Sequence, residues 1–269
     1  MRITALHSYP VKGCHRLDHD AAVVEPWGLA GDRRWMMIDA GGVGITQRDT
    51  PLLTQLTARP RPGGLVLSTP GLPALDVPEP VDGPKALARV FRSKEPVPAR
   101  VAESEWSSAF LGRDARLAWL ADPTGRSIES HALSTDRVSF ADGFPLLLAN
   151  TASLDAVNDW LVAAGDEPVP MTRFRPNLVV SGARPWDEDT WVGRRLRIGS
   201  MIFRAAKSCS RCVVTTIDQE TGEKGREPLR TLGRHRRYDD GLLFAINLVP
   251  DLPIGDAGLL RAGDPVTVV

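Results

Sequence analysis

The sequence has little cysteine, no net charge and no long apolar run. Its 269 residues include three cysteines, too few for a disulfide framework. Lys plus Arg and Asp plus Glu both number 33, which argues against steering of the whole protein toward nucleic acid or an anionic membrane. No stretch approaches the roughly 18 to 20 apolar residues of a membrane helix, and residues 1–10 lack a signal-peptide core. We therefore expect a cytoplasmic protein with reduced thiols and with neither nucleic acid nor membrane as a partner.

Short apolar stretches between Gly and Pro turns predict a β-rich α+β fold. Turns that recur about every 8 to 12 residues favour a barrel or sandwich. Strands are expected at 2–6, 21–25, 34–38, 53–56, 64–68, 99–101, 177–181, 196–198, 201–203, 213–217 and 265–269.

Two segments have helical patterns. Residues 103–111 end at Gly112, a typical helix C-terminal residue. Residues 151–162 repeat apolar side chains at helical spacing, and Asn150 or Thr151 can cap the start. We place a domain boundary between the two helices, giving domains 1–122 and 123–269.

The strongest chemical signal is the CxxC pair formed by Cys209 and Cys212. Arg211 lies between them and Lys207 just before them, and a neighbouring cation favours the reactive thiolate. Arg211 and Ser210 also supply donors suited to an anion. A redox dithiol, a zinc site completed by Cys14 and His15, and two inert core cysteines are the alternatives. The combination favours a soft metal carried by a phosphorylated cofactor.

Several cations occupy turns that follow expected strands. They are Lys12, Arg33, Arg48 and Arg175. One such residue is usually a solvated surface charge, whereas four together can converge on a phosphate. A further basic run at 230–237 predicts a solvated face.

Residues 184–191 combine two tryptophans with three acids. The indoles predict core anchors. The adjacent acids Glu188 and Asp189 are expected to be exposed in a loop rather than to form a general acid–base pair.

Ordered motifs along nearly the whole chain carry a family resemblance. They lie at 9–12, 28–33, 45–48, 140–145, 149–154, 173–177, 180–182, 186–191, 209–212, 218–222, 227–228 and 263–264. The chain resembles the MOSC-domain proteins of the mitochondrial amidoxime-reducing component type, bacterial relatives included. The resemblance implies an N-terminal β-barrel-like domain, a C-terminal MOSC β-barrel with flanking helices, and a cofactor in the cleft between them.

The resemblance also implies a molybdenum cofactor (Mo-molybdopterin) and its residues. Cys212 matches the protein ligand to molybdenum, and soft thiolate ligation suits the metal. The matches to other cofactor-contacting residues are Lys12, Arg33, Arg175, Asn177, Ser210 and Arg211, with Asp142 and Gly143 at the pterin.

The chain departs from the family pattern at two further positions. Gly13 stands where animal members have a serine, and Asn247, which we also assign to the cofactor site, stands where they have a tyrosine. No cysteine follows Cys212, so an iron–sulfur cluster like that of some bacterial relatives cannot form there.

The resemblance implies reduction of small N-hydroxylated compounds, such as amidoximes and N-hydroxylated bases. Electrons would come from a separate protein of ferredoxin, flavoprotein or cytochrome type. The main alternative is a carrier of sulfur or of the cofactor without reductase activity, and a third is a binding module.

Overall fold

The computed structural model describes residues 1–91 and 93–269, which fold into β-sheets flanked by a few helices. The strands are β1 (Arg2–Ser8), β2 (Leu17–His19), β3 (Ala21–Glu25), β4 (Gly28–Leu29), β5 (Trp35–Ile38), β6 (Thr57–Arg61), β7 (Gly64–Thr69), β8 (Leu72–Pro78), β9 (Lys85–Ala88), β10 (Val97–Glu103), β11 (Arg116–Trp119), β12 (Leu146–Asn150), β13 (Leu178–Ser181), β14 (Arg195–Ile198), β15 (Met201–Ser210), β16 (Arg237–Tyr238), β17 (Gly241–Pro250), β18 (Gly258–Arg261) and β19 (Val266–Val268). The α-helices are α1 (Glu105–Leu111), α2 (Thr151–Ala163) and α3 (Leu229–His235). Short 3-10 helices are η1 (Pro51–Gln55), η2 (Pro123–Gly125), η3 (Met171–Phe174), η4 (Asp187–Trp191) and η5 (Val213–Thr216). This architecture confirms the β-rich α+β fold.

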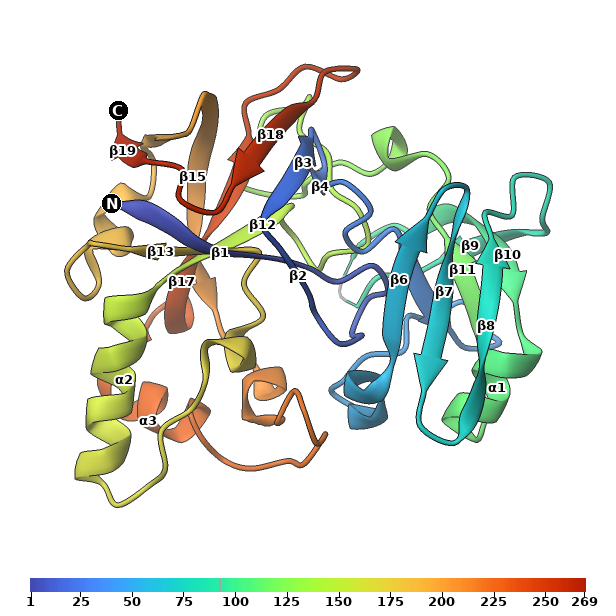
Figure 1. The fold of residues 1–269 in the computed structure, drawn as a ribbon, viewed down its shortest axis with the longest axis horizontal. Coiled ribbons are helices and arrows are strands. Elements are labelled where there is room, and N and C mark those ends of the chain that lie inside the picture. Colours follow the sequence, from blue (N-terminus) through green and yellow to red (C-terminus); the bar gives the residue numbers. More distant parts are fainter. Residues whose placement is uncertain (92) are drawn as a thin grey trace.

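The largest sheet has nine strands in the order β19-β14-β15-β17-β12-β13-β1-β2, with β16 paired to β17. Only β12 and β13 run parallel within it. The first strand of the chain therefore lies in a sheet built mainly from the second half, and α2 and α3 lie beside that sheet (Figure 1).

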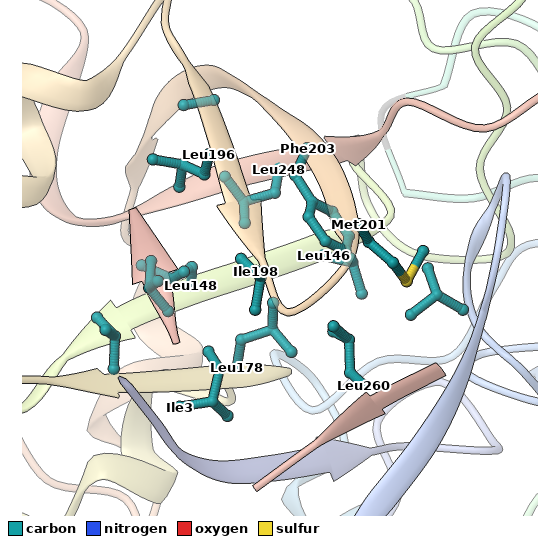
Figure 2. Packing of buried hydrophobic residues seen from close by; sticks show 14 of the residues in the cluster. Ile3, Leu146, Leu148, Leu178, Leu196, Ile198, Met201, Phe203, Leu248 and Leu260 are labelled. Atoms are coloured by element: carbon teal, nitrogen blue, oxygen red, sulfur yellow. The ribbon is translucent and has the colours of Figure 1, made fainter. Parts of the chain in front are cut away.

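A continuous apolar core fills the space enclosed by this sheet and β18 (Figure 2). Its side chains alternate along the strands, so that Leu196 and Ile198 of β14 both point inward while Arg195 and Arg197 are exposed. Such alternation is what a sheet with one buried face requires. The inward residues include Ile3, Leu146, Leu148, Leu178, Met201, Phe203, Leu248 and Leu260.

The N-terminal half contributes two smaller sheets of its own. They are β5-β11-β10-β9 and β6-β7-β8, which lie together on the side of the molecule away from α2 (Figure 1). A third sheet, β18-β3-β4, joins the two ends of the sequence. Because strands from each half pair with the other, the boundary at 122 stays a prediction.

Two expected strands are wrong. Residues 53–55 form the end of η1, and Leu56 follows it. The helix has Pro51 in its first turn, where the fixed φ of proline suits a helix start. Residues 213–216 form η5 instead of a strand, and Ile217 follows it. There the Thr215 hydroxyl donates to the Cys212 carbonyl at 3.0 Å and the Thr216 hydroxyl to the Val213 carbonyl at 2.8 Å. These local bonds overcome the β preference of a branched run.

Both expected helices are confirmed. Helix α1 ends at Gly112, whose φ of 64° is left-handed. Helix α2 starts after Asn150, whose side-chain oxygen accepts from the Ala152 N–H at 3.2 Å. Among the described residues, none of the helices is long and apolar enough to cross a membrane.

Candidate functional site

The cysteine motif lies where β15 leaves the large sheet. Strand β15 pairs with β17 as far as Ser210, and the Arg211 N–H continues the ladder to the Leu242 carbonyl at 2.7 Å. Cys212 then precedes η5, and its carbonyl accepts from the Thr215 N–H at 3.0 Å. Cys209 and Cys212 are both free and half-buried. The fold therefore fixes the backbone on both sides of the Cys212 thiol.

Arg211 ties the first cysteine of the motif to the core. Its Nη1 lies 3.0 Å from the Cys209 Sγ, and its Nη2 donates to the Phe174 carbonyl at 2.7 Å. The Nε is buried and has no partner within the described part of the chain. Cys209 is thus held by its own loop, and Arg211 keeps one donor available for a ligand.

A chain of polar contacts leads from the N-terminal half to the Cys212 sulfur. The Lys12 ammonium donates to the Phe140 carbonyl at 2.8 Å and pairs with the Asp142 carboxylate. The other Asp142 oxygen accepts from Arg48 Nη2 at 2.7 Å. The same nitrogen lies 3.6 Å from the Cys212 Sγ, within reach of a weak N–H···S bond.

Burial and neighbouring charges shift the pKa values of Lys12 and Asp142 in opposite directions. Burial lowers the pKa of Lys12 to about 8, although the Asp142 charge works against that shift. Desolvation pushes the pKa of Asp142 up, but the Lys12 and Arg48 charges outweigh it and hold the pKa below its ordinary value. Asp142 is therefore an anion that fixes two cations.

Arg126 braces the loop that carries Asp142. Its guanidinium donates to the carbonyls of Ser139, Ala141 and Asp142, and to the Ser93 hydroxyl at 3.0 Å. Gly143 follows in the same loop, and an added Cβ there would meet nothing within 4 Å. The loop thus leaves open space beside a rigid carboxylate.

Tyr9 lies between two of the expected cofactor-binding arginines. The Arg33 guanidinium carbon lies 4.5 Å from the ring centroid and that of Arg175 lies 4.0 Å from it. Both arginines have left-handed backbones, with φ of 50° and 53°. The Tyr9 hydroxyl donates to the Pro176 carbonyl at 3.1 Å. The buried ring is a platform that aligns two positive side chains.

Both the oxygen and the nitrogen of the Asn177 side-chain amide have hydrogen-bond partners. Its side-chain oxygen accepts from Arg33 Nη1 at 3.1 Å and from the Leu147 N–H at 3.2 Å, and its amide donates to the His7 carbonyl at 3.1 Å. The side chain is 1% exposed. It therefore orients Arg33 and connects β1 with β12, and it presents no surface to a ligand.

The other predicted residues, Ser210 and Asn247, have fewer hydrogen bonds to the rest of the site. Ser210 is exposed at the end of β15, and Asn247 sits in β17 opposite Lys207 and Leu147. Neither side chain makes a hydrogen bond to another described residue. Gly13 has a φ of 86°, and an added Cβ would meet the Leu53 side chain at 3.0 Å. A side chain at position 13 is therefore strained, which is consistent with glycine there.

Three residues absent from the predicted cofactor set belong to the site by their contacts. Arg48 reaches the Cys212 sulfur, Tyr9 aligns two arginines, and Gln219 accepts from Arg175 Nη1 at 2.7 Å. Arg48 was recognisable as one of four turn cations. Gln219 lies in the motif at 218–222, but nothing in the sequence indicates that its amide contacts Arg175.

Asp218 stabilises the loop that holds Gln219. One carboxylate oxygen accepts from the N–H groups of Glu220 and Thr221 at 2.9 and 3.0 Å, and the other pairs with Arg173 Nη2 at 3.1 Å. This residue is structural.

Two expectations for the surface need correction. Glu188 is fully buried, not exposed, and accepts from the Asn150 amide at 2.9 Å. Arg236, in the basic run, is buried as well and pairs with Asp189 while stacking on Trp186 at 4.2 Å. The expected indole anchors are confirmed, since Trp191 is buried and Trp186 stacks on Trp160 at 5.4 Å.

The residues present fit an anionic, thiolate-ligated cofactor. The Cys212 thiol is half-buried. Five arginines carry a buried nitrogen that lacks a partner among the described residues, and three of these belong to the loops described above: Arg173 Nε, Arg175 Nη2 and Arg211 Nε. Unpaired buried donors are costly unless a ligand satisfies them, and a phosphate is the matching acceptor. Across 1–91 and 93–269, no cluster of three or more His, Cys, Asp or Glu side chains is arranged to hold a metal ion.

The structure also has a hollow that lies apart from these residues. It has a volume of about 440 Å³ and is lined by β9, β10 and the turn at 121–125. None of the residues described above lines it.

Comparisons with known proteins identify two domains and a family. Residues 1–114 match the MOSC N-terminal beta barrel domain and residues 135–267 match the MOSC domain. The chain is 30% identical over 287 residues to mitochondrial amidoxime reducing component 2 of Bos taurus, covering 98% of this chain and 82% of that protein. It is 29% identical over 285 residues to mitochondrial amidoxime-reducing component 1 of Homo sapiens, covering 98% and 82%.

A molybdenum cofactor sulfurase of Oryza sativa subsp. japonica is 30% identical over 269 residues, covering 89% of this chain and 31% of that protein. The alignments with these three relatives cover 89 to 98% of this chain. The chain belongs to the MOSC-domain proteins of the mitochondrial amidoxime-reducing component type.

Proposed function

We propose that this protein is a molybdenum-cofactor-dependent reductase of small N-hydroxylated compounds, amidoximes and N-hydroxylated bases among them. One observation carries the proposal: the half-buried Cys212 thiol lies at the end of a polar chain formed by Lys12, Asp142 and Arg48. A soft ligand beside fixed cations suits a metal that is held by both a thiolate and an anionic pterin. The names of the relatives support a function related to the molybdenum cofactor.

The protein's own residues would bind and orient the cofactor. Cys212 would supply the thiolate ligand. Arg173, Arg175 and Arg211 each have a nitrogen without a partner among the described residues, which could donate to anionic oxygens. Asn177 and Tyr9 hold the neighbouring arginines in place. Gly143, with open space around it, would leave room for the pterin. When bound, the cofactor supplies the two-electron reduction chemistry, and the protein contributes binding, orientation and charge.

Electrons would come from a separate protein of ferredoxin, flavoprotein or cytochrome type, and we propose the cytoplasm as the location. The second candidate is a cofactor or sulfur carrier. It is favoured by the similarity to a protein named molybdenum cofactor sulfurase, and in it Cys212 would hold cofactor in transit or bear a persulfide.

The first test is metal and pterin analysis of purified protein, with Cys212→Ser beside the wild type. We expect near-stoichiometric molybdenum and pterin in the wild type, and loss of most molybdenum and of amidoxime reduction in the variant. Cys209→Ser is the matched control, because the Cys209 sulfur contacts Arg211 and takes no part in the polar contacts of Lys12, Asp142 and Arg48. It should keep most of its molybdenum.

The outcomes separate the candidates. Zinc without pterin in the wild type would contradict a molybdenum protein. Cofactor that transfers readily to an apo-acceptor, with no reduction of amidoximes, would favour the carrier. Full activity in Cys212→Ser would rule out the thiolate ligand.

A further inference from the structure

We infer that Arg48 is a positioning residue for the Cys212 sulfur, and so the means by which the N-terminal half tunes the metal ligand. This inference rests on the proposed function. It concerns a residue outside the cofactor-binding set that the family resemblance implies. It follows from three contacts of the Arg48 side chain and one of its backbone carbonyl.

The first two contacts fix the direction of the guanidinium. Nη2 has two hydrogens, and its two acceptors are the Asp142 carboxylate at 2.7 Å and the Cys212 Sγ at 3.6 Å. The charge-assisted bond to the carboxylate is the stronger one. Because Asp142 is itself held by Lys12, it aims the second hydrogen of Arg48 at the sulfur.

The other two contacts hold the rest of the residue. The guanidinium carbon lies 3.7 Å from the centroid of the Phe91 ring, a stacked arrangement that blocks one face. The Arg48 carbonyl accepts from the Lys224 ammonium at 3.1 Å. The side chain is only 16% exposed. Arg48 is therefore fixed by residues from both halves of the chain.

The two cysteines of the motif differ in how their arginines reach them. Cys209 contacts Arg211 of its own loop, whereas Cys212 contacts an arginine 164 positions away. The arginine at Cys212 is thus set by how the two halves pack. A positive N–H donor at a ligating thiolate withdraws electron density from the sulfur, and such outer contacts tune a metal's reduction potential.

Lys12 cannot take the place of Arg48. Its ammonium is bonded to the Phe140 carbonyl and to Asp142, and it contributes to the sulfur only through the carboxylate. A lysine at position 48 would keep the charge but lose the planar fork that serves two acceptors at once. Arg48→Lys is therefore expected to restore part of what Arg48→Gln loses.

The test compares Arg48→Gln, Arg48→Lys and Arg16→Gln in molybdenum-loaded protein. Arg16 is the matched control, because it also pairs across the two halves, with Glu220, and does not touch Cys212. The measurements are molybdenum per chain, the Mo(V) electron paramagnetic resonance spectrum, the midpoint potential, and kcat/KM for benzamidoxime.

For Arg48→Gln we expect retained molybdenum, a changed Mo(V) spectrum, a lower midpoint potential and a kcat/KM about tenfold to a hundredfold lower. Arg48→Lys should lie between this variant and the wild type, and Arg16→Gln should match the wild type. A merely structural Arg48 would leave spectrum and potential unchanged in folded, loaded protein, and that result would overturn the inference.

Failure of the proposed function has a different signature. A loaded wild type that reduces no amidoxime contradicts the proposed activity, yet its spectrum and potential still respond to Arg48→Gln if the inference holds. A wild type that contains no molybdenum overturns both.

Discussion

Glu188 carries its carboxylate in a fully buried position, where one oxygen accepts from Asn150 and the other has no partner among the described residues. Burial raises the pKa of this group above its ordinary value of 4.5. The folded protein therefore binds the proton more tightly than the unfolded chain does. The contribution of Glu188 to stability is most favourable below pH 4.5, and it declines as the pH rises from there through the raised pKa of the folded state.

Glu188→Gln should remove this decline. At pH 8 we expect the variant to be more stable than the wild type by about 1–3 kcal/mol, because a neutral amide replaces a buried charge and can still accept from Asn150. At pH 4 the difference should be small. Thermal unfolding at both pH values checks this. The exposed Glu223→Gln is the control and should follow the wild type, whereas equal effects of Glu188→Gln at both pH values would contradict the explanation.

At the scale of single helices and strands, the local sequence pattern predicts some elements correctly and others wrongly. The spacing of residues 151–162 predicted α2 and its Asn150 cap, because helix periodicity and capping depend on neighbours in sequence. The same reasoning failed at 213–217, where β-branched residues indicated a strand. The Thr215 and Thr216 hydroxyls bond back to the preceding turn instead. Residue type alone does not reveal that choice.

Helix α1 offers a prediction at this scale. Gly112 has a φ of 64° and Gly125 has an ordinary φ, yet an added Cβ would meet nothing within 4 Å at either position. Only backbone strain distinguishes them, so Gly112→Ala should cost about 1 kcal/mol or slightly more. Gly125→Ala should be neutral or slightly stabilising. Urea unfolding of the two variants side by side measures the difference, and equal losses would contradict the role of the left-handed C-cap.

Across the whole molecule, the site depends on pairings that no local pattern contains. The cysteine motif and the four turn cations could be picked out from sequence because their residue types suit a thiolate and an anion. The bond from Arg48 to Cys212 depends on how the two halves pack, and the bond from Arg175 to Gln219 joins residues 44 positions apart within the second half. Sequence could suggest candidates for this site, and packing decides which of them meet.

The Gln47–Gln219 pair is one of the links between the halves. The two amides bond reciprocally at 3.0 and 3.1 Å, and both side chains are buried. Gln219→Ala should lower the free energy of unfolding by about 1–3 kcal/mol, because it leaves Gln47 and Arg175 with unpaired buried donors. Chemical denaturation checks this.

Gln55→Ala is the matched control for that experiment. Gln55 also crosses between the halves, donating to the Glu220 carbonyl at 2.7 Å, but this bond is exposed. Its loss should change the free energy of unfolding by no more than about 0.5 kcal/mol. Equal losses in the two variants would show that burial of the amide pair is unimportant.

The position of β1 in the large sheet has a consequence for biosynthesis. Its register joins Leu6 to Leu178 of β13, so β1 leaves the ribosome long before its partner strand has been made. At about 5–20 residues per second, roughly 10–35 s separate the synthesis of these two strands. During that interval the apolar side chains of β1 lack their native cover. A newly made chain is therefore most vulnerable to aggregation and to capture by chaperones before β13 emerges.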